Sequence, residues 1–136
     1  MTAAIAELQQ AIFKTLVEDE DLIGKLGGVK IYDQVPERVA LPYIVIGRTT
    51  SNDWSTSTED GEAVTLFIHV WSRSGARTQC HELQQHLKRI LHDTSQTLES
   101  NHLVALRLVF SETRRDQVSE HLHGVMRFRG VTEVSV

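Results

Sequence analysis

Histidines and clustered acids are the residues of this sequence whose types and spacing could do chemistry. His121 and His123 are two residues apart, which places both imidazoles on one face of a strand, a spacing that can chelate zinc or copper. Two histidines are too few ligands for such a site, and no acidic or cysteine partner is fixed by local spacing. We therefore expect no metal site at this position.

Four acids lie in one polar stretch and are candidates for a pair of catalytic carboxylates: Asp53, Glu59, Asp60 and Glu62. A solvated loop is the commoner meaning of such a stretch. His69 alternates with Phe67 and Trp71, which favours a packed or interface histidine over a general base. Cys80 lies on an apolar helical stripe and is interpreted as a small buried hydrophobe. No nucleotide-binding, serine-hydrolase, zinc-protease or calcium-loop motif is present in the sequence. We therefore expect that the chain is not an enzyme and that it binds no cofactor.

The composition is that of an ordinary globular domain. The chain has 136 residues, 40% hydrophobic and 24% charged, with 18 acids against 14 Lys and Arg, giving a net charge of −4. We expect a single domain over residues 1–136. The acidic balance argues against a dedicated nucleic-acid binder, and one cysteine excludes an internal disulfide framework. No apolar run approaches the ~18 residues needed to cross a bilayer, and the N-terminus does not resemble a signal peptide, so we expect no membrane partner.

The first third of the chain predicts a helix and two strands. Apolar residues at intervals of three to four predict a helix over residues 2–26, with Thr2 as its N-cap and Gly27 just past its end. The acidic cluster at residues 18–21 is where a second helical turn would begin. Strands are predicted over residues 29–32 and 43–49, joined by a proline-containing connection. Residues 51–60 are interpreted as an exposed loop or hairpin arm that ends in an Asp-Gly turn.

The remainder predicts one more helix and three strands. The strand over residues 62–71 is apolar on both faces, which predicts a central strand of a sheet that is covered on both sides. A helix over residues 75–92 begins at Ser74 as its N-cap. Strands follow over residues 103–110 and 123–134, with residues 111–121 as a loop. The order α-β-β-β-α-β-β predicts an α+β fold with a single, mostly antiparallel sheet and two main helices.

Several arginines lie near the C-terminus and form a candidate basic patch: Arg107, Arg114, Arg115, Arg127 and Arg129. Acids are interleaved with them and no aromatic ladder accompanies them, so sequence-specific nucleic-acid recognition is not predicted. Residues 1–37 hold seven acids and three bases, whereas residues 103–136 hold four acids and five bases. Two ends of opposite net charge would favour head-to-tail contacts between copies of the chain, although charged residues scattered over a solvated surface are the simpler explanation.

Six local patterns, taken in order, resemble a known family: Ile31-Tyr32-Asp33-x-Val35-Pro36, Leu41-Pro42-Tyr43-Ile44-Val45-Ile46-Gly47, Asp53-Trp54-Ser55-Thr56, Glu59-Asp60-Gly61-Glu62, His69-Val70-Trp71-Ser72-Arg73 and His123-Gly124-Val125-Met126-Arg127-Phe128-Arg129. Together they resemble the tail-completion, or tail-terminator, proteins of long-tailed phages, prophages and gene transfer agents. The resemblance extends over nearly the whole chain. No single pattern is specific by itself.

The resemblance implies a ring-forming structural protein of the virion with no catalytic residues. It implies a homo-hexamer at the head-proximal end of the tail tube that stops tube polymerisation and joins the tail to the head connector. DNA would pass through its lumen without specific binding, and assembly would take place in the bacterial host cytoplasm. The alternatives are a head-closure or adaptor protein of the connector and, in a different class, a small metal-dependent hydrolase that uses His121, His123 and the loop acids.

The residues that would make the contacts are inferred from their types and not carried over from the family. We expect protein interfaces at Asp53, Trp54, Glu59 and Asp60 in the polar stretch, because a tryptophan amid polar residues seldom lacks a partner. The other possibility for Trp54 is a ring folded back on its own sheet. The segment Arg114-Arg115 is the second expected interface, facing an acidic edge of the next copy.

Overall fold

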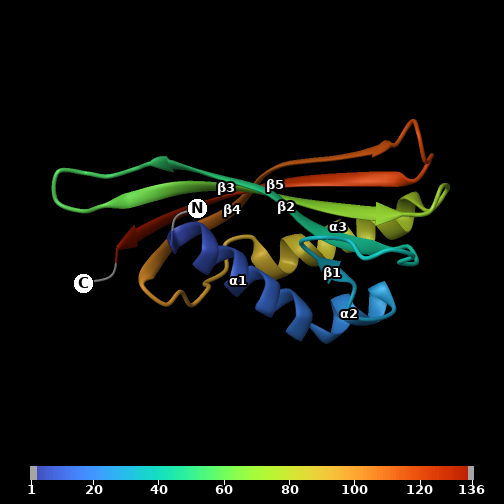
Figure 1. Ribbon diagram of the computed structural model, residues 1–136, viewed down its shortest axis with the longest axis horizontal. Coiled ribbons are helices and arrows are strands. Elements are labelled where there is room, and N and C mark those ends of the chain that lie inside the picture. The colour runs from blue at the N-terminus through green and yellow to red at the C-terminus, as the bar shows by residue number, and fades with distance from the viewer. Residues whose placement is uncertain (1–2, 135–136) are drawn as a thin grey trace.

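The computed structural model describes residues 3–134, which form a layer of helices on one face of a five-stranded sheet (Figure 1). The elements are α1 (Ala3–Glu18), α2 (Glu20–Leu26), β1 (Ile31–Tyr32), β2 (Tyr43–Asp53), β3 (Gly61–Ser72), α3 (Arg77–Leu91), β4 (Asn101–Arg115) and β5 (Leu122–Val134). The strand order is β1-β2-β3-β5-β4. Only β1 and β2 pair in parallel, and the other pairs are antiparallel. The predicted α+β fold with one mostly antiparallel sheet is thus confirmed.

The core lies between the helices and one face of the sheet. The stripe of α1 predicted from the spacing of its apolar residues is buried, with Leu8, Ile12 and Leu16 at 1% exposure or less. From α3, Cys80, Leu83, Leu87 and Leu91 are buried against the sheet, which contributes Val64, Leu66, Ile68 and Phe128. The prediction of a buried Cys80 is confirmed. None of the helices within residues 3–134 is long and apolar enough to cross a membrane.

The predicted first helix is two helices separated at Asp19. The carboxylate of Asp19 accepts a hydrogen bond from the Leu22 amide at 2.9 Å and so caps the N-terminus of α2. Gly27 ends α2 in the left-handed region at φ 78°, as predicted. The predicted N-cap Ser74 is wrong, because Ala76 occupies the cap of α3 without a side-chain bond. Thr2 lies outside the described residues.

Two strands are longer than their sequence patterns indicate. Strand β2 continues to Asp53, and β4 covers residues 101–115, so residues 111–115 are strand and the predicted loop over 111–121 is too long. The two extensions lie toward opposite ends of the sheet, where that of β2 reaches past the helices and that of β4 is contacted by α3 through Gln84 and Thr113 (Figure 1). There neither face of the strand is buried, so the alternation that marks a strand in the sequence is lost. The extensions are held by cross-strand pairing, as in Arg115 opposite Leu122.

The prediction that the sheet is covered on both sides is wrong for the single chain. All three helices lie on one side of the sheet, and no described element covers the other face (Figure 1). We call this other side the open face. On β3 it carries Thr65, Phe67, His69 and Trp71, which are all partly exposed. The sequence pattern identified two apolar faces, but the second is left available for contacts beyond the chain.

The middle of the outer strand β4 is capped by the turn that follows α3. The amide of Asp93 donates to the Leu106 carbonyl at 2.8 Å, and the Leu108 amide donates to His92 Nδ1 at the same distance. Arg107 adds an ion pair with Asp93 at 2.9 Å. At the opposite edge, β1 pairs with β2 only at Ile44 and Val45. Both edges of the sheet therefore keep unpaired stretches: β4 on either side of its middle, and β2 beyond the two residues that pair with β1.

Candidate functional site

Three arginines converge in a hollow on the open face. Arg48 on β2 and Arg127 and Arg129 on β5 line a depression of about 520 Å³ that crosses the sheet, together with Thr50, Thr65, Phe67 and Val109. We call this hollow the arginine groove. Arg127 and Arg129 share one face because they are two residues apart on a strand, opposite Phe67 and Thr65. The groove thus presents guanidinium groups above an apolar and hydroxyl floor.

Aromatic rings hold two of these guanidinium groups in place. The Arg129 guanidinium lies 4.7 Å from the centre of the Trp54 ring, and that of Arg127 lies 5.3 Å from the centre of the Phe110 ring. Both distances are within the range of cation–π attraction. Within residues 3–134 no carboxylate forms an ion pair with Arg48, Arg127 or Arg129. Oriented, unpaired guanidinium groups of this kind bind carboxylate or phosphate oxygens.

A stacked pair of histidines lies on the same face, farther along β3 and β5. His69 Nδ1 and His123 Nε2 are 2.8 Å apart and share a hydrogen bond, and the His123 ring stacks on Trp71 with centroids 4.0 Å apart. Burial lowers the pKa of His69. Burial, the neighbouring His69 and Arg114 together lower the pKa of His123 to about 4. Both rings are therefore neutral at pH 7. His69 is packed against His123, in agreement with the packed or interface histidine that the sequence predicts.

His123, one of the two histidines considered for metal binding, contacts other side chains of the sheet. His123 makes its contacts with His69 and Trp71, on neighbouring positions of the sheet. Among residues 3–134 no group of three or more His, Cys, Asp or Glu side chains is arranged to hold a metal ion. His123 is thereby a packing residue of the open face.

The acidic stretch forms the projecting end of the β2–β3 hairpin (Figure 1). Asp53 Oδ1 accepts hydrogen bonds from the amide and the hydroxyl of Ser55, at 3.2 and 2.6 Å. A hydrogen bond with Glu59 raises the pKa of Glu133, because two carboxyl groups so close cannot easily both ionise. Part of the negative charge of this hairpin is thus engaged within the chain.

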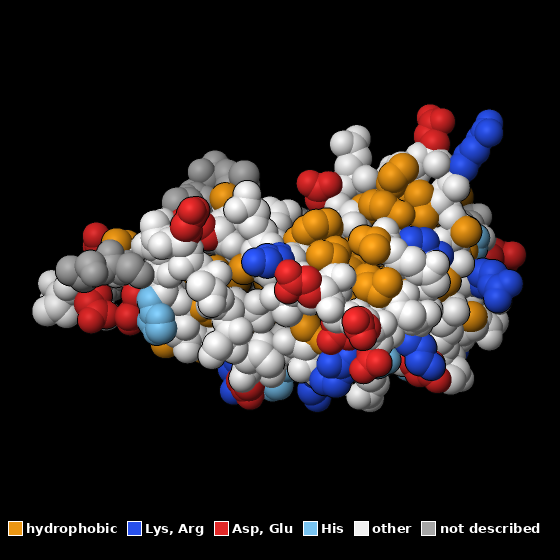
Figure 2. All heavy atoms as spheres, turned by 90° about the horizontal axis from the view of Figure 1, so that it is seen from below, with side chains coloured by type: hydrophobic (Ala, Val, Ile, Leu, Met, Phe, Trp, Pro, Cys, Tyr) orange, Lys and Arg blue, Asp and Glu red, His pale blue; other side chains and the backbone are white. Residues whose placement is uncertain are grey.

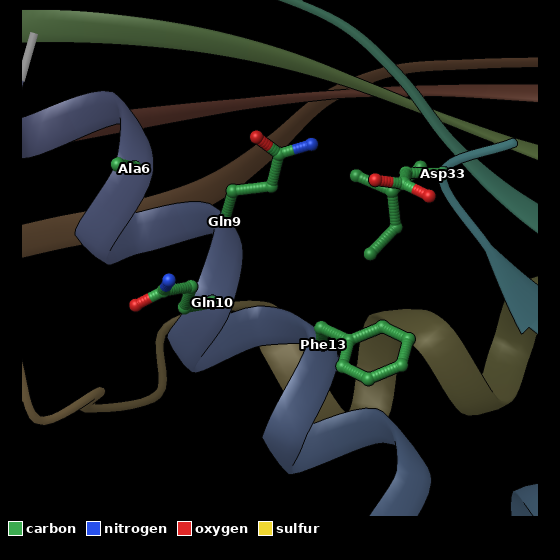
Figure 3. A pocket seen from close by; sticks show the side chains of 6 residues that line it. Ala6, Gln9, Gln10, Phe13 and Asp33 are labelled. Atoms are coloured by element: carbon green, nitrogen blue, oxygen red, sulfur yellow. The ribbon is translucent and has the colours of Figure 1, made fainter.

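A second hollow lies on the helix side, beside the free edge of β2. It has a volume of about 400 Å³ and is lined by Ala6, Gln9, Gln10, Phe13, Asp33 and Ile46. Figure 3 shows Gln9 and Phe13 of α1 on the side of the hollow that faces Asp33, with Gln10 turned away. Phe13 is 41% exposed, which is unusual for a large aromatic side chain in the middle of a helix.

The model of one family, described as tail completion protein gp17, matches residues 10–133. The chain belongs to this family. A tail completion protein gp17 of Bacillus phage SPP1 is 27% identical over 88 residues, and this match covers 65% of each chain, or just under two thirds of the phage protein's length. A chain in the structure of the virion of a native gene transfer agent particle superposes with a TM-score of 0.88 at 25% identity, over 97% of this chain and 99% of that chain.

Family membership confirms the resemblance found in the sequence and makes the chain a structural tail protein of a phage-type virion. Within this tail completion protein, the expected interface residues lie at opposite ends of the sheet. Asp53, Trp54, Glu59 and Asp60 belong to the β2–β3 hairpin, whereas Arg114 and Arg115 pair with the start of β5. Trp54 lies over Arg129, on its own sheet, and is still 56% exposed.

The arginine groove of this tail completion protein could be found only in part from the sequence. Arg127 and Arg129 belong to the basic patch that the sequence predicts. Arg48 lies within the irregularity in the pairing of β2 and β3 between Ile46 and Thr49, and no sequence pattern predicts which face a residue at such a point takes. The contacts of Trp54 with Arg129 and of Phe110 with Arg127 were not predicted from the sequence.

Proposed function

We propose that six copies of this tail completion protein form a ring at the head-proximal end of the tail tube. The ring caps the last layer of tube protein, stops polymerisation and joins the tail to the head connector. The observation that carries the proposal is the family match over residues 10–133, together with a sheet that has one face uncovered in the single chain. An uncovered apolar face is typical of a protein that completes its core by association.

The placement of the expected interface residues supports contacts at two levels. The β2–β3 hairpin and the β4–β5 turn project from opposite ends of the sheet (Figure 1). In a ring, such ends reach the partners above and below: the tube protein on one side and the connector or adaptor on the other. Trp54 and the pair Arg114 and Arg115 are the contact residues we propose, at the two ends respectively.

The chain's charge supports passage of DNA through the lumen without specific binding. With a net charge of −4 per copy, a ring of six is negative overall, which on balance repels phosphate. The acids of the hairpin, Asp53, Glu59 and Asp60, are exposed and would repel any DNA that passes close to this end of the sheet. The ring thereby caps the tube and lets DNA pass, and it catalyses no reaction of the DNA.

Particle assembly without this chain tests the proposal. We expect deletion to give tube structures of uncontrolled length and few joined heads and tails by electron microscopy, and we expect the purified ring to have the mass of six copies. Trp54→Ala and Arg115→Glu should each reduce joined particles, whereas the matched change Arg73→Glu, at another exposed arginine, should not. Tails of normal length, joined to heads in the absence of the chain, would overturn the proposed function.

A further inference from the structure

We propose that the arginine groove is the contact surface for a second copy of this chain and takes the carboxylates at the junction of α1 and α2. These are Glu18, Glu20 and Asp21, which we call the acidic corner. The contact is front to back, with the open sheet face of one copy on the helix side of the next. This inference rests on the proposed ring and names the surfaces that build it.

The groove has the features of a surface that needs an anionic partner. Arg48, Arg127 and Arg129 bring three positive charges into one hollow, in a chain whose net charge is −4. Two of the guanidinium groups are oriented by aromatic rings, so that less side-chain entropy is lost when they bind. Like charges that line one hollow repel one another, and an incoming carboxylate relieves that repulsion. The groove is thereby matched to a cluster of acids.

The acidic corner offers unengaged carboxylates on the opposite layer. Glu18 ends α1, and Glu20 and Asp21 form the first turn of α2; all three side chains are exposed. Asp19, between them, is already used, because its carboxylate binds Arg89 at 2.9 and 3.1 Å and caps α2. Within the described part of the chain, Glu18, Glu20 and Asp21 form no ion pair, although Asp21 lies in the field of Arg89.

The acids of the β2–β3 hairpin are the weaker candidates for the groove. Asp53 is engaged by Ser55, and Glu59 is hydrogen-bonded to Glu133. Nucleic acid is also disfavoured. The rings that could stack on bases, Trp54 and Phe110, each already contact a guanidinium group, and the chain is acidic overall. The observations therefore favour protein carboxylates from the acidic corner.

A front-to-back contact also joins apolar surface on both partners. The floor of the groove includes Phe67 and Val109, the latter 48% exposed. On the helix side, Figure 2 shows hydrophobic side chains gathered over one half of the face, with acidic side chains beside them. Contacts between two different surfaces of one chain repeat from copy to copy and close into a ring when the rotation allows it. The hairpin ends stay free for the layers above and below.

Charge reversal in particle-producing cells that lack their own copy of the gene tests this contact. Arg127→Glu with Arg129→Glu should lower the yield of joined particles roughly tenfold or more, and so should Glu18→Arg with Glu20→Arg. All four changes in one chain restore opposite charges across every front-to-back contact and should recover most of the yield. Combining Arg127→Glu and Arg129→Glu with Glu59→Arg and Asp60→Arg should give no recovery.

Two controls keep the result interpretable. Arg73→Glu with Arg77→Glu changes the same charge at exposed positions outside the groove and should leave the yield unchanged. Each purified variant is checked by circular dichroism, and if the groove variant fails to fold, Glu18→Arg with Glu20→Arg carries the test, since both residues are exposed on helices. Normal yield from that second variant would then overturn the inference.

The remaining outcomes are equally decisive. No recovery in the four-change chain, or recovery with the hairpin acids instead, overturns the acidic corner as the partner. Stronger binding of a labelled DNA duplex by the wild-type chain than by the groove variant, with unchanged rings, assigns the groove to nucleic acid and overturns the inference. In both cases the proposed function stands if deletion of the gene still gives tails of uncontrolled length. It fails separately if deletion has no effect.

Discussion

Acidification should weaken this fold through His123, because its neutral form is required in the folded chain. Its pKa is lowered from the ordinary 6.5 to about 4 by burial, by His69 and by Arg114. Above pH 6.5 the ring is neutral in both the folded and the unfolded state. Between pH 6.5 and about 4 the unfolded chain binds a proton that the folded chain does not. The free energy of unfolding therefore falls as the pH falls through this window.

The size of the loss follows from the two pKa values. Their difference corresponds to about 3.4 kcal/mol for a group fully shielded from water. The His123 ring is only half-buried, and solvent screens part of this penalty, so we expect about 1.5 kcal/mol from His123 between neutral pH and about pH 4.5. His69, whose pKa is lowered in the same direction, adds to the loss.

Urea unfolding of the wild type and of His123→Gln, each at about pH 7 and about pH 4.5, measures this contribution. The variant loses the stack on Trp71 and is less stable at neutral pH, so the quantity to compare is the loss between the two pH values. We expect a smaller loss in the variant by about 1.5 kcal/mol. The control is His81→Gln, at an exposed position of α3. Equal losses in the wild type and His123→Gln would refute the reasoning.

Four further substitutions test the packing, two glycine positions and the cap of α2 by the same urea unfolding. Leu87→Ala removes a fully buried side chain of α3 and should lower stability by about 2–5 kcal/mol. Gly61→Ala would place a Cβ 2.8 Å from a backbone oxygen and should destabilise by about 1–3 kcal/mol, whereas Gly24→Ala meets no atom within 4 Å and should stabilise α2 by about 0.5–1 kcal/mol. Asp19→Ala removes the cap of α2 and the pair with Arg89, at about 1–2 kcal/mol.

Each of these has a matched control or a contradicting result. Gln85→Ala, exposed on the same helix as Leu87, should change stability by less than about 0.5 kcal/mol. Gly61→Ala as stable as the wild type would mean that the hairpin shifts freely at this point. Glu18→Ala, next to Asp19 but outside the cap, should have little effect. A loss from it equal to that from Asp19→Ala would contradict the capping argument.

The helical layer was predictable because its residues repeat one simple pattern. Leu83 and Leu87 of α3 and Leu8 and Ile12 of α1 lie at the spacing that one helix face requires, and all of them are buried. The apolar residues on both faces of β3 identified its central position in the sheet equally well. What the sequence could not tell is which of its two apolar faces the chain itself covers, because that depends on how the helices pack.

The contacts of the candidate site depend on strand register, which no local pattern specifies. His69 meets His123 because the pairing of β3 with β5 brings together positions 54 residues apart. That pairing, together with the pairing of β2 with β3, brings Trp54, just after β2, within reach of Arg129 on β5. The long ends of β2 and β4 were missed for the opposite reason: their residues face water on both sides, so composition there resembles a loop.

The bonds from His92 and Asp93 to the middle of β4 have a consequence for how copies avoid sticking to one another. An unbroken outer strand of 15 residues would be a template on which any other exposed strand could add. With Leu106 and Leu108 already engaged by the turn, only short stretches on either side stay open. Edge-to-edge pairing of β4 strands from different copies into fibres is thereby disfavoured.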